Sequence, residues 1–207
     1  MSFLTLLDYA SVLVFAASGA MVASRAQLDI VGFAFMACLT AVGGGTVRDL
    51  LLDRHPVFWV ADSVPILLAV WMAVLVFFTA HLVESRLRWV VWLDSFALAI
   101  AVPAGTGAAL QLGHGPVIVV LMGMATGAFG GLMRDVVCNE VPLVLKQGEP
   151  YMSCAMAGAI SAVLLVWFGV PLSLALLSCA GVTWGMRASA LMWGWSLPVY
   201  KSRPPRQ

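Results

Sequence analysis

The chain has 207 residues, of which 62% are hydrophobic and only 10% are charged, with a formal net charge of +1 at pH 7. Soluble globular domains carry about 25% charged residues, so this composition excludes an ordinary soluble domain. It also provides no basic run for binding nucleic acid. Since one membrane crossing takes about 20 apolar residues, we expect a single transmembrane domain over residues 1–207, with no room for a separate soluble domain.

Apolar runs divided by polar residues, glycine or proline predict seven membrane-spanning helices. The expected spans are 8–24, 30–52, 65–83, 89–110, 116–138, 152–168 and 172–194. None of them shows the two-residue alternation of a barrel strand. Because only helices and closed barrels satisfy backbone polar groups in lipid, the sequence predicts an all-α membrane bundle.

Basic residues are unevenly divided between the two faces of such a bundle. The face of the C-terminus would hold Arg25, Arg86, Arg88, Lys146, Lys201, Arg203 and Arg206. The opposite face would hold only Arg54. The positive-inside rule therefore predicts a multi-pass protein of the cell inner membrane with its N-terminus outside and its C-terminus in the cytoplasm. The basic tail 195–207 is expected to meet anionic lipid headgroups rather than a soluble partner.

The chain also contains an internal repeat. TAVGGGTVRDLLLDRHP at 40–56 matches TGAFGGLMRDVVCNEVP at 126–142, an offset of 86 residues. The repeats are expected at about 5–84 and 89–168, with the seventh helix, about 172–194, outside them. Each repeat holds three spans, an odd number, so the second must enter the membrane from the opposite side. Inverted repeats with interrupted helices point to a permeation or substrate site near the bilayer midplane.

Glycines interrupt the second and fifth spans at matching positions: Gly43, Gly44, Gly45, Gly130 and Gly131. Each glycine costs about 1 kcal/mol of helix propensity relative to alanine, which favours a bend or local unwinding. Freed carbonyls at such a bend could coordinate a cation. The alternative is close packing through a stripe of small residues. Thr40 and Thr126 could offer hydroxyls to a pore, although such hydroxyls more often bond their own helix backbone.

Two charged pairs follow the glycines, Arg48 with Asp49 and Arg134 with Asp135. Charges in membrane spans are costly and therefore candidates for function. The pairs either neutralise themselves, bond across to the other repeat, or supply negative potential to a cation path. Asp8 and Asp94, at the starts of the first and fourth spans, are most simply helix caps, with a pore vestibule as the alternative.

The motifs GGGTVRDLLLDRHPVFW and GLMRDVVCNEVPLVL, in duplicated three-helix units followed by one more helix, resemble the prokaryotic members of the TRIC (trimeric intracellular cation) channel family. The resemblance covers about positions 5–197. It implies a homotrimer in which each protomer has its own hydrophilic pore, kinked around the five glycines and passing monovalent cations, chiefly K⁺. It leaves open whether Na⁺ also permeates and whether lipid binds.

Two positions depart from the family pattern. Phe129 occupies the place of the first glycine in the second motif, and its bulk is expected to stiffen the second break or partly occlude the pore. Asn139 replaces the glycine usual before Glu-Val-Pro, which is expected to alter only the loop. Because of Phe129, the break in the fifth span is not expected to be equivalent to the glycine break in the second span.

The expected function is a passive, K⁺-permeable channel. The alternative is a carrier of glycine or a similar small amino acid, motivated by the inverted repeats and by the glycine transporter label that bacterial sequences of this kind carry. The hypothesis of a purely structural membrane protein is less favoured, because it leaves the paired charged motifs unexplained. No Walker loop, catalytic triad or zinc-ligand spacing occurs in the sequence, so we expect neither an enzyme nor a metal site or other cofactor.

Overall fold

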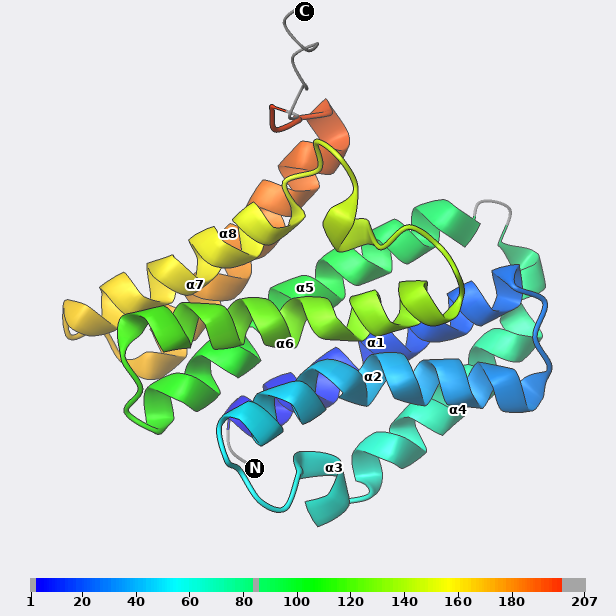
Figure 1. The fold of residues 1–207 in the computed structure, drawn as a ribbon, viewed down its shortest axis with the longest axis horizontal. Helices are drawn as coiled ribbons and strands as arrows, with labels where there is room; N and C mark the ends of the chain where they lie inside the picture. The colour runs from blue at the N-terminus through cyan, green and yellow to red at the C-terminus, as the bar shows by residue number, and fades with distance from the viewer. Residues whose placement is uncertain (1–2, 84–85, 199–207) are drawn as a thin grey trace, which may run out of the picture.

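The computed structural model describes residues 3–83 and 86–198, and this part of the chain is entirely helical outside its loops. Residues 199–207 of the predicted basic tail, with Lys201, Arg203 and Arg206, lie outside the described residues. The N-terminal half lies on one side of the molecule and the C-terminal half on the other, with α1, α2, α5 and α6 meeting in the middle (Figure 1).

In the described part of the chain, seven long helices overlap the seven segments predicted as spans. They are α1 Phe3–Arg25, α2 Ile30–Leu51, α4 Val64–Thr79, α5 Arg86–Gln111, α6 Pro116–Val137, α7 Tyr151–Trp167 and α8 Leu172–Trp193. Three short elements lie in the loops: α3 Phe58–Ala61, η1 Ala80–Leu82 and η2 Leu143–Leu145. Within the described residues, six helical segments are long and apolar enough to cross a membrane, and α7 is a shorter apolar helix. The protein is therefore an all-helical, multi-pass membrane protein.

Local signals explain where several helices begin. Asp29 precedes α2 and its carboxylate accepts the Gly32 N–H at 2.7 Å, which satisfies one of the backbone donors left unpaired at a helix start. Pro65 and Pro116 stand in the first turns of α4 and α6, where a missing N–H costs nothing. Asp29 and Pro116 thus mark the ends of the loops after α1 and α5, and each of these two helices packs against the helix that follows it.

Backbone conformations recur 86 residues apart. After α2, Asp53 has φ 52°, and after α6, Asn139 has φ 53°. The backbone N–H of the next residue then donates a hydrogen bond to the end of the helix. Arg54 donates to the Asp49 carbonyl at 2.8 Å, and Glu140 donates to the Asp135 carbonyl at 2.9 Å. Asparagine and aspartate tolerate the left-handed conformation better than most residues. Asn139 thus takes the same backbone conformation as its counterpart in the first motif.

Helices α2 and α6 cross at their glycines. A Cβ added to Gly44 would collide with the Thr126 carbonyl oxygen, and one added to Gly130 would lie 2.5 Å from the Thr40 carbonyl oxygen. Along α2, Thr40 comes before Gly44, but Thr40 meets Gly130 and Gly44 meets the earlier residue Thr126 of α6. The two helices therefore run antiparallel. Both helices are continuous α-helix through the glycines. The expectation of local unwinding is therefore wrong, because close backbone contact uses the glycines instead; a bend within an intact helix stays a prediction.

We expect Gly44→Ala to lower the free energy of unfolding by about 1–3 kcal/mol, the usual cost of overpacking, because the new methyl group meets backbone that cannot rotate away. The matched control is Gly181→Ala in α8, where an added Cβ meets nothing within 4 Å. Thermal unfolding in detergent measures both variants. A midpoint for Gly44→Ala equal to that of the control would contradict the close contact between α2 and α6.

Candidate functional site

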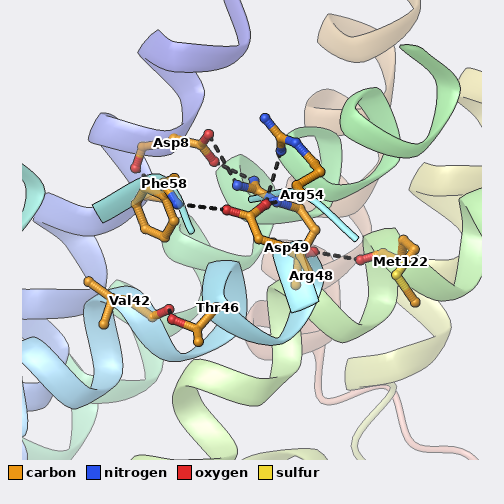
Figure 2. Close-up of polar contacts among 10 residues, drawn as sticks. Asp8, Val42, Thr46, Arg48, Asp49, Arg54, Phe58 and Met122 are labelled. Atoms are coloured by element: carbon orange, nitrogen blue, oxygen red, sulfur yellow. Dashed lines mark hydrogen bonds and ion pairs between the residues drawn. The ribbon is translucent and has the colours of Figure 1, made fainter. Parts of the chain in front are cut away.

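The first charged cluster, Asp8, Arg48, Asp49 and Arg54, lies at the C-terminal end of α2 (Figure 2). The Arg48 side chain is 1% exposed; its Nε lies 2.8 Å from Asp49 Oδ1 and its Nη1 lies 2.5 Å from Asp8 Oδ1. Arg54 Nη1 lies 3.0 Å from the same Asp49 oxygen. The second oxygen of Asp49 accepts the Phe58 N–H at 2.9 Å. Two cations and two anions therefore balance in this cluster.

The second charged cluster, Asp94, Arg134, Asp135 and Tyr151, lies at the C-terminal end of α6 and is more deeply buried. The Arg134 side chain is 0% exposed; its Nε lies 2.7 Å from Asp135 Oδ1 and its Nη1 lies 2.8 Å from Asp94 Oδ1. Tyr151 donates its hydroxyl to Asp94 Oδ2 at 2.6 Å. Asp135 Oδ2 accepts the Leu143 N–H at 2.9 Å, as Asp49 accepts that of Phe58 in the first cluster.

Asp8 and Asp94 are not helix caps, so that expectation is wrong. Asp8 lies inside α1 and Asp94 inside α5, and each faces the arginine that follows it by 40 residues. A guanidinium buried in a low-dielectric interior needs carboxylates within hydrogen-bond distance, and this requirement fixes both aspartates. The shared spacing of 40 residues in the two repeats is the sequence signal that could have revealed the pairing.

Each arginine takes both carboxylates from its own half of the chain. Arg134 also donates to the Ser18 hydroxyl of α1, a bond between the halves. Two of the hypotheses for the charged pairs therefore match contacts in the structure. Each arginine is neutralised by the aspartate that follows it, and Arg134 also bonds to the other repeat. Since α2 and α6 are antiparallel, the two clusters lie at opposite ends of the crossing.

The remaining predicted site residues lie in helix contacts. The hydroxyls of Thr40 and Thr126 are buried and donate to the carbonyls four residues earlier, both at 2.7 Å. Phe129 is half-buried on α6. An added Cβ on Gly43, Gly45 or Gly131 would lie 2.9 Å from Met133 Sδ, 2.5 Å from Phe58 Cε1 and 2.9 Å from Asp94 Oδ1, respectively. The crossing is thus closely packed in this structure.

Sequence reasoning missed the polar side chains that surround the clusters. Arg187 of α8 is 1% exposed, lies 2.6 Å from Glu149 Oε2, and places its guanidinium 5.1 Å from the centre of the Tyr151 ring. Its position inside an expected span was the available signal. On the other side, Tyr9 donates its hydroxyl to Asp62. This bond, helped by the Val64 N–H, lowers the pKa of the Asp62 carboxyl below its usual value.

Residues 3–83 and 86–198 contain no group of three or more His, Cys, Asp or Glu side chains placed to hold a metal ion. The acidic side chains of the two clusters are paired with arginine instead. The two clusters therefore hold carboxylate oxygens in fixed positions, one set at the C-terminal end of α2 and the other at the C-terminal end of α6.

We expect Arg134→Gln to destabilise the protein more than Arg48→Gln, although the two arginines occupy equivalent positions. Losing Arg134 leaves Asp94 and Asp135 buried without a cation, at a cost of about 3–5 kcal/mol. Losing Arg48 costs less, because Asp49 keeps Arg54 and the Asp8 side chain is 15% exposed. Thermal unfolding in detergent compares the two; a larger loss for Arg48→Gln would contradict the assigned burial and pairing.

Comparison with protein families identifies relatives along the whole chain. The family model described as "Glycine transporter" matches residues 5–81 and again residues 91–167, two stretches that begin 86 residues apart. The UPF0126 inner membrane protein YadS of Escherichia coli K12 is 36% identical over 198 residues, which cover 94% of each chain. The UPF0126 membrane protein YvgT of Bacillus subtilis is 31% identical over 195 residues, covering 93% of this chain and 94% of that one.

Solved structures give the same result. The TRIC trimeric intracellular cation channel orthologue from Rhodobacter sphaeroides matches with a TM-score of 0.90 and 43% identity, over 94% of this chain and 100% of that one. A second structure, of a TRIC cation channel, matches with a TM-score of 0.86 and 26% identity, over 99% of this chain and 100% of that one. These relatives support the prediction that the chain is not an enzyme. The chain belongs to the TRIC family, which the glycine transporter family model and the UPF0126 proteins also represent.

Proposed function

We propose that this protein is a passive cation channel of the bacterial inner membrane. The observation that carries the proposal is the 43% identity to the Rhodobacter sphaeroides TRIC channel orthologue along nearly the whole chain. Fold alone does not imply function, but the glycines of the crossing and an arginine–aspartate pair at each of its ends are present here as well. The name of YadS as an inner membrane protein supports the location.

Seven spans in two inverted repeats are the membrane arrangement we propose. The antiparallel crossing of α2 and α6 supports the inversion, as does the double match of the family model. Helix α7 has 17 residues, which lies at the short end of the range that spans a bilayer. With seven spans, the described basic residues Arg25 and Lys146 share the face of the C-terminus, which supports a cytoplasmic position for that face.

The proposed pore follows the crossing of α2 and α6, and the described structure represents its closed form. Gly44 and Gly130 leave no room for a methyl group, and therefore none for a hydrated ion. When the helices separate, the carbonyls of Thr40 and Thr126 face the gap, and carbonyl oxygens can replace part of a cation's hydration shell. The second charged cluster has two carboxylates and one arginine, so it carries net negative charge at one end of the gap, which favours cations over anions.

We further propose that the protein is a homotrimer with one pore per protomer, that K⁺ is the main permeant ion with Na⁺ as a second, and that membrane lipid binds to it. The trimer is supported by the name of the matched Rhodobacter sphaeroides structure. Large apolar side chains exposed along the outer helices, such as Leu67, Trp71 and Phe78 of α4, provide surface for lipid or for neighbouring protomers.

In a planar bilayer under a KCl gradient, we expect discrete currents that reverse near the K⁺ equilibrium potential and do not respond to added glycine. Pure lipid and protein inactivated by heat serve as controls. Reversal toward the Cl⁻ potential would overturn the cation assignment. A silent bilayer together with saturable exchange of labelled glycine in vesicles would make the protein a carrier instead.

The membrane orientation has its own test. A green fluorescent protein fused to the C-terminus is expected to fluoresce, and alkaline phosphatase fused at the same point is expected to be inactive, because each reporter works on only one side of the bacterial inner membrane. The reverse pattern would place the C-terminus outside and contradict the positive-inside assignment.

A further inference from the structure

The short helix α3 begins with Phe58, which lies beside Asp8 and Asp49 of the first charged cluster (Figure 2). The Phe58 ring lies against Gly45 and 5.6 Å from the guanidinium carbon of Arg48. The Phe58 N–H reaches Asp49, and Trp59 donates its indole N–H to the Thr46 hydroxyl at 2.9 Å. These contacts shield Asp49, which is 1% exposed.

Helix α3 is held by few contacts. None of its four residues is buried, and its partly buried Phe58 ring packs against the edge of the apolar core. Two hydrogen bonds, to Asp49 and to Thr46, add to this ring contact. A third bond, from Tyr9 of α1 to Asp62, anchors the residue that follows it. Segments with few buried apolar contacts open at low free-energy cost.

The corresponding segment at the other end of the crossing is fixed more firmly. The Leu143 N–H donates to Asp135 as that of Phe58 does to Asp49, but Leu143 is 5% exposed and belongs to an apolar core. The loop that follows is held by the Arg187–Glu149 ion pair and by the Leu197 N–H, which donates to the Gly148 carbonyl at 2.8 Å. Helix α8, which has no counterpart in the first half, supplies Arg187.

We propose that α3 is a lid on the first cluster, and that the bundle opens at this end while the end at η2 stays closed. Opening removes the Phe58 N–H from Asp49 and exposes the Thr46 hydroxyl. One carboxylate oxygen and one hydroxyl then become available to water and to an entering cation, while Arg48 and Arg54 still hold the other oxygen of Asp49. The lid movement stands on geometry alone; its role as the channel gate rests on the proposed function.

Hydrogen exchange at two equivalent amides tests the lid. The Phe58 and Leu143 amides donate to equivalent carboxylates at the same distance, 2.9 Å, so differences in exchange report mainly how often each segment opens. We expect the Phe58 amide of the native protein to exchange at least about ten-fold faster than the Leu143 amide, after correction for intrinsic rates. Equal rates, or faster exchange at Leu143, would overturn the proposal.

Removing one anchor of the lid sharpens the test. Tyr9→Phe deletes the hydroxyl bonded to Asp62, and we expect it to speed exchange at Phe58 about five-fold, the effect of losing one ordinary hydrogen bond, with no change at Leu143. Thr46→Val removes the acceptor for Trp59 and should act in the same direction. Tyr151→Phe is the matched control, because it deletes a tyrosine hydroxyl at the other end. An exchange rate at the Phe58 amide that neither Tyr9→Phe nor Thr46→Val changes would contradict the assignment of the anchors.

The electrical consequence is measured separately in planar bilayers. Tyr9→Phe is expected to raise the open probability about five-fold while leaving the unitary current unchanged, since it weakens an anchor of the lid and alters no residue of the crossing. If the native protein carries no cation current, the proposed function is overturned. The exchange rates at Phe58 and Leu143 would still show whether α3 opens as a lid. Normal native current with an open probability unaffected by Tyr9→Phe and Thr46→Val would overturn α3 as the gate.

Discussion

The ion pairs around two buried arginines are the interaction on which this bundle depends. Arg48 and Arg134 are 1% and 0% exposed, and an unpaired guanidinium at such depth is costly enough to prevent folding. Each therefore requires two carboxylates at hydrogen-bond distance, one from the next residue and one from another helix. This requirement fixes the rotation of α1 against α2 and of α5 against α6, and thereby determines which faces meet at the centre.

Close backbone approach is the second constraint. The glycines of α2 and α6 place each helix directly on a carbonyl of the other, as small residues do in membrane bundles where no hydrophobic effect drives association. The contact needs intact helices, and this explains why the glycines do not unwind them. A crossing maintained by packing rather than by a network of hydrogen bonds can also separate without breaking backbone bonds, which suits a channel that opens and closes.

Much of this organisation could be predicted from the sequence. Long apolar runs gave the seven helices because lipid admits few other structures, and the offset of 86 residues revealed the repeated motif. Periodicity alone could not predict the partners of the arginines, since it shows that Asp8 and Asp94 begin apolar segments but not which neighbour they face; the shared spacing of 40 residues is the signal that points to them. Helix α3 is too short to produce a periodic pattern, and Tyr151 is one aromatic residue in an apolar run. Their roles depend on contacts between segments distant in the chain.

The distribution of partners between the halves bears on how the protein enters the membrane during synthesis. Asp8, Arg48 and Asp49 all emerge from the ribosome within the first three-helix unit, and Asp94, Arg134 and Asp135 within the second. Each unit can therefore neutralise its own arginine while it inserts, before the other half exists. The weaker bond from Arg134 to Ser18 waits for the halves to meet, as does the partly exposed ion pair between Arg25 and Glu140. Insertion and assembly become separate steps, and neither leaves an unpaired charge in lipid.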